Sequence, residues 1–63
     1  MNDLTKTILI VDDETFVRQS LSDYFEDNLF RVLQADSGEK ALKILENETP
    51  EGAIVDIRMG GMD

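Results

Sequence analysis

The sequence predicts an α/β fold in which three parallel strands alternate with two helices, in the order β-α-β-α-β. Three short runs of apolar, mostly β-branched residues alternate with two segments of helical periodicity. The chain has 63 residues, of which 41% are hydrophobic and 32% charged. This composition is typical of a globular chain at the lower edge of domain size.

The first expected strand is Thr7–Val11, a continuous apolar run. Such a run is typical of a strand that is buried on both faces. The residues that follow it, Asp12, Asp13 and Glu14, are all acidic. They suit the start of a helix, whose amino end carries a partial positive charge.

The first expected helix runs from Thr15 to Asn28. Its polar side carries Arg18, Gln19, Ser22, Asp23 and Glu26. Apolar residues recur at helical spacing, which predicts an amphipathic helix with one face in the core. The residues at this spacing are Phe16, Val17, Leu21, Tyr24, Phe25 and Asn28. The expected core residues are Phe16, Phe25, the apolar side of Tyr24, and Phe30 from the next segment.

The second strand is expected at Phe30–Ala35, after a turn at Asp27 and Asn28. Ser37 is a suitable N-cap for a second helix, because its hydroxyl can accept a hydrogen bond from a free backbone N–H group. The apolar stripe of that helix consists of Ala41, Leu42 and Leu45.

The third strand is expected at Ala53–Ile57, another run of the buried type, after a loop marked by Pro50 and Gly52. Residues 58–63 are expected to form the loop beyond it. Right-handed crossovers that place one helix on each face give the strand order 2-1-3. Ligands in such sheets bind at the carboxyl ends of the strands, here beside strands 1 and 3.

The composition excludes several kinds of chemistry. The chain has no cysteine and no histidine, so disulfides, thiolate metal sites and histidine-based catalysis are absent. Its formal net charge is −8, which disfavours direct contact with nucleic acid. No apolar run is long enough to cross a membrane and the first residues do not resemble a signal peptide, so we expect a cytoplasmic location.

Three carboxylates are expected to meet at the carboxyl edge of the sheet. Asp12 and Asp13 follow strand 1, and Asp56 lies near the end of its predicted neighbour, strand 3. Like charges at short range disfavour ionisation, and a hard cation such as Mg²⁺ relieves the conflict. This set suits phosphoryl transfer with a carboxylate nucleophile. Taken alone, Asp12 and Asp13 are equally explained as a solvated strand end and a helix cap.

Three segments resemble the receiver domain of two-component response regulators, a flavodoxin-like, doubly wound fold. They are Ile8–Glu14 (ILIVDDE), Phe30–Leu42 (FRVLQADSGEKAL) and Val55–Asp63 (VDIRMGGMD). Each segment is a weak signal by itself, but all three occur in order and at suitable spacing. Gly60 departs from the family pattern, in which proline is usual.

The resemblance implies a role for each acidic residue. Asp56 would accept a phosphoryl group from a sensor histidine kinase or a phosphotransfer protein. Asp13 and Asp56 would bind Mg²⁺ directly, Asp12 would assist through a metal-bound water, and the Arg58 backbone carbonyl would be a further ligand. The chain would be a regulatory phosphoacceptor rather than an enzyme, beyond catalysis of its own phosphorylation and dephosphorylation.

The resemblance further implies that residues 1–63 form the N-terminal half of a receiver, with three of its five strands. The switch residues (a Ser or Thr and a Lys) and the output would lie outside this chain, which would then be unable to switch by itself. A half-domain is also expected to self-associate through its open strand edge. The alternative is a fragment of a Mg²⁺-dependent phosphatase of the haloacid-dehalogenase type, although Glu14 stands where that class requires Asp. A dinucleotide-binding fold is disfavoured because the glycine-rich turn is missing.

Overall fold

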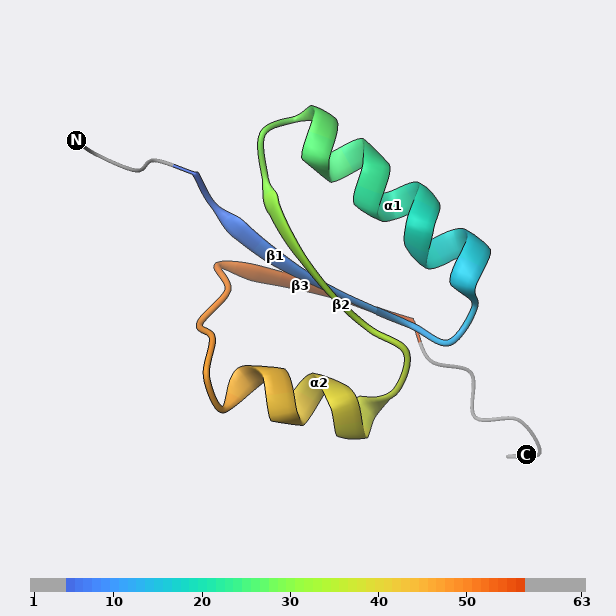
Figure 1. Cartoon of the computed structure of the whole chain (residues 1–63), viewed down its shortest axis with the longest axis vertical. Helices are drawn as coiled ribbons and strands as arrows, with labels where there is room; N and C mark the ends of the chain where they lie inside the picture. Colours follow the sequence, from blue (N-terminus) through green and yellow to red (C-terminus); the bar gives the residue numbers. More distant parts are fainter. Residues whose placement is uncertain (1–4, 57–63) are drawn as a thin grey trace.

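The computed structural model describes residues 5–56 as a three-stranded sheet with two helices (Figure 1). The elements are β1 (Thr7–Asp12), α1 (Thr15–Asp27), β2 (Arg31–Ala35), α2 (Gly38–Leu45) and β3 (Gly52–Asp56). This is the predicted β-α-β-α-β succession. The expected end of the third strand, Ile57, lies outside the described residues.

The sheet has the strand order β2-β1-β3, and both strand pairs are parallel. The predicted order 2-1-3 is therefore confirmed. In the register, Thr7 pairs with Arg31 and Ile8 pairs with Gly52. Figure 1 shows α1 and α2 on opposite sides of the strands, as two right-handed crossovers require.

The core forms around β1, the central strand. Leu9 and Val11 lie on one face of the sheet and pack with Ala35 of β2 and Ala41 of α2. Successive side chains of a strand point to opposite faces, so Ile10 belongs to the α1 side, and it is 0% exposed. The apolar run of β1 is therefore covered on both faces of the sheet, which confirms the prediction of a strand buried on both faces.

The orientation of α1 differs from the prediction. Phe16 and Tyr24, expected in the core, are 82% and 61% exposed, whereas Ser22, expected on the polar side, is fully buried. Phe25 is half-buried, and Arg18 bonds to the strands. Residues 18, 22 and 25 share one helix face because they are separated by four and three positions. The helix therefore turns a mixed face toward the sheet, and the small Ser22 side chain permits close approach.

A compact turn joins α1 to β2. The N–H of Phe30 donates to the carbonyl of Phe25 at 2.9 Å, and the N–H of Leu29 donates to the carbonyl of Glu26 at 3.0 Å. This pair of bonds is the Schellman motif. Leu29 has φ of 68° and occupies the left-handed position at which glycine is favoured. The expected contact beside the motif is present, since the Phe25 and Phe30 rings lie edge to face at 5.3 Å.

The second helix begins as predicted. The Ser37 hydroxyl accepts a hydrogen bond from the backbone N–H of Lys40 at 3.2 Å, which confirms the N-cap. Of the expected apolar stripe, Ala41 is buried, but Leu42 and Leu45 are 66% and 46% exposed. The prediction was wrong for these two leucines because α2 lies against β2 and β1 and has no contact with β3.

Neither helix covers β3. Within residues 5–56, no residue of α1 or α2 comes within 8 Å of β3, measured between Cα atoms. Val55 is accordingly 64% exposed, and Ala53 is exposed too. The sequence predicted a strand of the buried type here. The strand is present, but most of its side chains are not buried.

Candidate functional site

Asp12 lies at the carboxyl end of β1, where its side chain is buried and hydrogen-bonded. It is the last residue of β1 and only 3% exposed. Its carboxylate Oδ1 accepts a hydrogen bond from the backbone N–H of Glu14 at 2.9 Å. An aspartate commonly bonds to the backbone two residues further on where a strand turns into a helix. This bond satisfies a side chain that would otherwise be costly to bury.

Asp13 lies between the end of β1 and the start of α1, and its side chain is exposed. Within residues 5–56, no hydrogen bond or ion pair involves this carboxylate. Its position just before α1 places it near the positive end of the helix dipole. Asp13 is therefore a carboxyl oxygen donor that is open to solvent.

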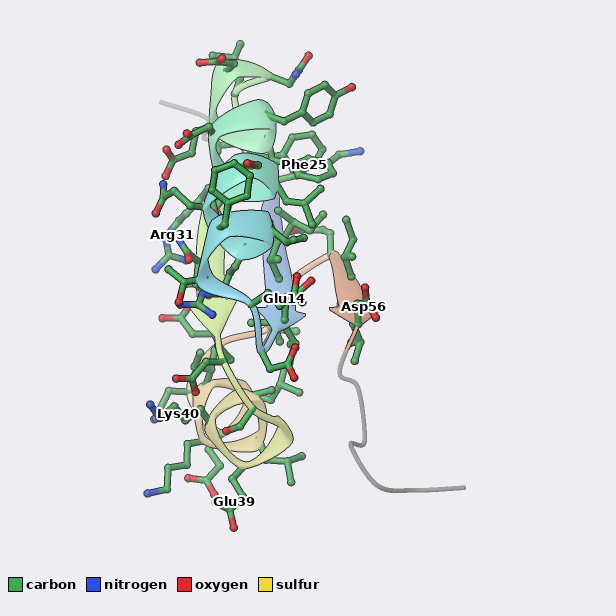
Figure 2. All side chains as sticks on the ribbon, turned by 90° about the vertical axis from the view of Figure 1, so that its right-hand side faces the viewer. Glu14, Phe25, Arg31, Glu39, Lys40 and Asp56 are labelled. Carbon is green, nitrogen blue, oxygen red and sulfur yellow. The ribbon has the colours of Figure 1, made fainter. Side chains whose placement is uncertain are left out.

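Asp56 is the last residue of β3 and is the partner of Asp12 in the strand register. Neighbouring parallel strands lie ~4.8 Å apart, and paired residues direct their side chains to the same face. Asp56 is exposed, in contrast to Asp12. Figure 2 shows Asp56 at the end of β3, on the same side of the molecule as Glu14 at the start of α1. The edge thus combines one fixed carboxylate with one accessible carboxylate.

The acidic residues do not form a closed metal cage. In the described part of the chain, no three His, Cys, Asp or Glu side chains are gathered closely enough to hold a metal ion. The predicted meeting of Asp12, Asp13 and Asp56 is therefore not seen among residues 5–56. Mg²⁺ usually retains several waters and takes only one or two carboxylates from the protein. The register places Asp12 beside Asp56, and two carboxylates are enough for that mode of binding. The fourth predicted ligand, the Arg58 carbonyl, lies outside the described residues.

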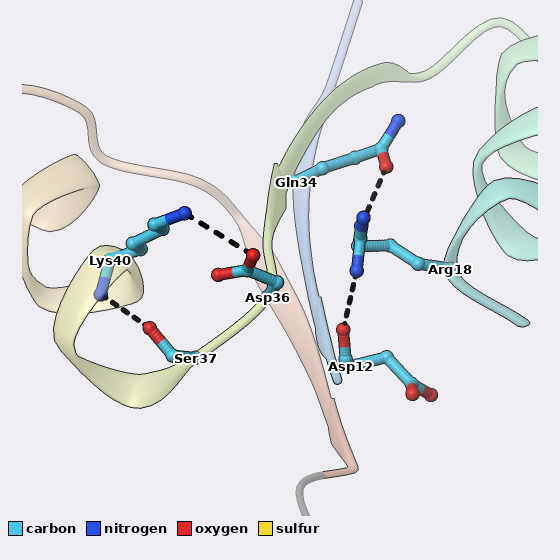
Figure 3. Close-up of polar contacts among 6 residues, drawn as sticks. All are labelled: Asp12, Arg18, Gln34, Asp36, Ser37 and Lys40. Carbon is cyan, nitrogen blue, oxygen red and sulfur yellow. Dashed lines mark hydrogen bonds and ion pairs between the residues drawn. The ribbon is translucent and has the colours of Figure 1, made fainter. Parts of the chain in front are cut away.

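Sequence reasoning missed Arg18, which was placed on the polar side of α1. Its guanidinium donates from Nη1 to the Asp12 carbonyl at 2.8 Å and from Nε to Oε1 of Gln34 at 3.1 Å (Figure 3). The signal in the sequence is an arginine one helical turn after the acidic run. Arg18 also borders an open hollow with a volume of about 240 Å³, lined by Arg18, Gln34, Ala35, Asp36 and Lys40.

Elsewhere in the molecule, an ion pair lowers the pKa of a glutamate. Arg31, at the start of β2, donates from Nη1 to Oε1 of Glu48 at 3.1 Å. The hydrogen bond and the positive charge of Arg31 lower the pKa of Glu48 below its ordinary value of 4.5. This pair lies at the amino end of β2, away from the edge that carries Asp12 and Asp56.

No helix among residues 5–56 is long and apolar enough to cross a membrane.

The model of the response regulator receiver domain family matches residues 8–63. The chain belongs to the response regulator receiver family. It therefore folds as the first half of a receiver, with three of the family's strands in their expected order. Receiver domains are the regulatory phosphoacceptors of two-component systems, and this family assignment decides against the haloacid-dehalogenase alternative.

Curated relatives support the same family. The receiver chain is 35% identical over 60 residues to sporulation initiation phosphotransferase F of Bacillus subtilis, covering 95% of this chain and 48% of the relative. It is 44% identical over 55 residues to the heme response regulator HssR of Staphylococcus epidermidis, covering 87% and 25%. A cyclic di-GMP phosphodiesterase of Thermotoga maritima is 38% identical over 56 residues, covering 89% and 15%. The chain thus spans about half of one relative and a quarter or less of the other two.

Proposed function

We propose that Asp56 accepts the phosphoryl group in this receiver, from a sensor histidine kinase or a phosphotransfer protein. The observation that carries the proposal is the register pair of Asp12 and Asp56 at the carboxyl edge. Asp12 is buried and holds the turn to α1, whereas Asp56 is exposed to an incoming donor. The two paired carboxylates are thereby suited to different tasks.

In the proposed reaction, a carboxylate oxygen of Asp56 attacks the phosphorus of the donor's phosphohistidine. A P–O bond to Asp56 forms while the P–N bond breaks, and the released imidazole nitrogen takes up a proton. Asp13 and Asp56 would hold Mg²⁺ directly, with Asp12 acting through a water and the Arg58 carbonyl as a further ligand. When bound, Mg²⁺ would neutralise charge on the phosphoryl oxygens and on the carboxylates that hold it.

Phosphoryl incorporation tests the role of Asp56. The protein is incubated with Mg²⁺ and acetyl phosphate, a small donor, and intact mass reports addition of a phosphoryl group. Asp56→Asn should abolish incorporation. Asp27→Asn makes the same chemical change at an exposed position at the end of α1 and should have no effect. Undiminished incorporation in Asp56→Asn would move the acceptor elsewhere.

Magnesium affinity tests the role of Asp13 separately. Asp13→Ala removes an exposed carboxylate and leaves the Asp12–Glu14 hydrogen bond in place. We expect Mg²⁺ to bind at least about tenfold more weakly, as followed by shifts in amide NMR signals during titration. Asp27→Ala is the matched control. Equal Mg²⁺ affinity in wild type and Asp13→Ala would contradict the ligand role.

We further propose that residues 1–63 are the N-terminal half of a receiver, whose switch residues and output lie outside this chain. Two facts support this: the chain spans 48% of the Bacillus relative, and among residues 5–56 β3 has one strand neighbour and no helix over it. Alone, the chain would not switch an output. The cytoplasmic location expected from the sequence stays a prediction.

The exposed β3 edge should also make this chain associate with itself. An open strand edge with exposed apolar residues such as Val55 invites pairing with another chain. Sedimentation should therefore show a mass that rises with protein concentration. Val55→Lys should suppress the rise, because a charged residue on an edge strand opposes pairing. A monomer mass at every concentration would overturn this part of the proposal.

A further inference from the structure

One guanidinium joins the carboxyl ends of β1 and β2. Arg18, in the first turn of α1, donates from Nη1 to the carbonyl oxygen of Asp12 at 2.8 Å. Its Nε donates to Oε1 of Gln34 at 3.1 Å (Figure 3). The planar fork of arginine suits two acceptors at once, whereas the ammonium group of lysine acts as a point charge.

The carbonyl that Arg18 holds belongs to the peptide bond between Asp12 and Asp13. A peptide group is planar, so fixing its oxygen also fixes the direction of the Asp13 N–H and restrains the backbone that carries the Asp13 side chain. The backbone N–H of Arg18 donates to the carbonyl of Glu14 at 2.9 Å. The Arg18 side chain therefore bonds the carbonyl that precedes Asp13, and the first backbone bond of α1 fixes the carbonyl that follows at Glu14.

We propose that Arg18 is a positioning residue for the Mg²⁺ site, acting through the Asp12–Asp13 peptide, with Gln34 as the anchor of its guanidinium. This inference rests on the proposed function, because it assumes that Asp13 binds Mg²⁺. Asp13 has an exposed side chain and no hydrogen-bonding partner among residues 5–56, so its backbone is what restrains it. Outer groups that orient a ligand typically change metal affinity by ~10–100-fold.

A purely structural role for Arg18 makes a different prediction. If Arg18 only fastened α1 to the sheet, its loss would lower the free energy of unfolding and leave the Mg²⁺ affinity of the folded protein unchanged. The positioning role predicts weaker Mg²⁺ binding in protein that remains folded. It also predicts that high Mg²⁺ restores the rate of phosphoryl incorporation, since only occupancy of the site is impaired.

The test compares two arginines that both make side-chain hydrogen bonds. Arg18→Lys keeps the charge but loses the two-acceptor geometry, and we expect Mg²⁺ to bind about tenfold more weakly. Arg31→Lys makes the same change at the ion pair with Glu48 and should leave Mg²⁺ affinity unaltered. Gln34→Leu removes only the anchor, at an exposed position, and should weaken binding to a smaller extent. Amide NMR titration gives the affinities, and denaturant unfolding gives the stability of each variant.

The outcomes separate the two proposals. Wild-type protein that shows no saturable Mg²⁺ response would refute the proposed function, and the role of Arg18 with it. A wild-type response that is equally strong in Arg18→Lys and Gln34→Leu would overturn only the role of Arg18. If Arg18→Lys does not fold, Gln34→Leu decides, because unchanged Mg²⁺ affinity in that folded variant refutes the positioning role of Arg18. Recovery of incorporation at high Mg²⁺ in either variant supports the proposal.

Discussion

Val11 and Val55 are the same residue at paired positions of neighbouring strands, but their surroundings differ greatly. Val11 of β1 is 1% exposed, and its register partner Val55 of β3 is 64% exposed. The central strand has a strand on each side and a helix over each face. The edge strand has one strand neighbour and, within residues 5–56, no helix nearby.

This difference separates two properties, strand formation and burial, that an apolar run is expected to predict together. A β-branched run favours extended backbone and strand pairing, and β1 and β3 both form strands. Burial depends in addition on which helices lie over the strand. Stability should therefore concentrate around β1 and α2, while β3 contributes the proposed acceptor Asp56 and little of the core.

The largest expected effect is a direct test of the valine pair. Val11→Ala removes two buried methyl groups and leaves a cavity, so we expect a loss of about 2–3 kcal/mol in the free energy of unfolding. Val55→Ala should change it by less than about 0.5 kcal/mol, because that side chain is mostly solvated. Urea unfolding monitored by circular dichroism gives both values. Equal losses would mean that β3 is covered in solution.

A gain in stability is expected from Ser22, whose buried hydroxyl has no hydrogen-bonding partner among the described residues. Leaving such a group unsatisfied costs about 1–3 kcal/mol. Ser22→Ala should therefore stabilise the protein by about 1 kcal/mol more than Ser20→Ala. Ser20 is an exposed position of the same helix, so it controls for the higher helix propensity of alanine. If the two variants are equally stable, the hydroxyl has a partner in solution.

The cap of α2 should have an effect of about 1 kcal/mol. Ser37→Ala removes the acceptor for the Lys40 backbone N–H, which is one of the free donors at the helix start. Because α2 covers β1 and β2 but not β3, amide exchange should accelerate in α2 and β1 before it changes in β3. Ser37→Asp, which can also cap, should retain most of the stability. Unchanged unfolding in Ser37→Ala would show that the cap contributes nothing.

The smallest effect concerns pH. Arg31 lowers the folded-state pKa of Glu48. The stabilisation by this ion pair is therefore present above the unfolded-state pKa of 4.5, and it is lost as the pH falls through the folded-state pKa. Glu48→Gln should therefore lower stability slightly at neutral pH, and the difference from wild type should shrink in acid. The pair is partly exposed, so added salt should reduce the effect. A difference that grows as the pH falls would contradict the assignment.

The backbone arrangement was predictable from the sequence. Apolar runs, helical spacing, Ser37 and the loop at Pro50 predicted the five elements, and connection rules predicted the strand order. The predicted bounds that fall within residues 5–56 agree with the observed ones to about one residue. The Asp12–Asp56 pairing follows from that order. Its use as a phosphoacceptor site stays a prediction, since neither the fold nor the family match identifies the residue that reacts.

The rotation of α1 could not be read from its periodicity. Hydrophobic spacing favoured a face with Phe16 and Tyr24, whereas the observed face contains Arg18 and Ser22. Arg18 can face the sheet because its guanidinium reaches the Asp12 carbonyl at the end of β1, and Ser22 can because it is small. Such compensation depends on the shape of the neighbouring strands, which a one-dimensional pattern does not contain.

The parallel register also has a consequence for the order of folding. Thr7 pairs with Arg31 across 24 positions of the chain, and Ile8 pairs with Gly52 across 44. Every strand contact therefore joins residues that lie far apart in the sequence. The pairing of β1 with β3 closes the longer loop, and α2, which lies in that loop, has no contact with β3. We expect β1, α1 and β2 to assemble first and β3 to join last and detach most readily. On this view, the last strand to arrive delivers Asp56 to its partner Asp12, so the site is completed only in the final step of folding.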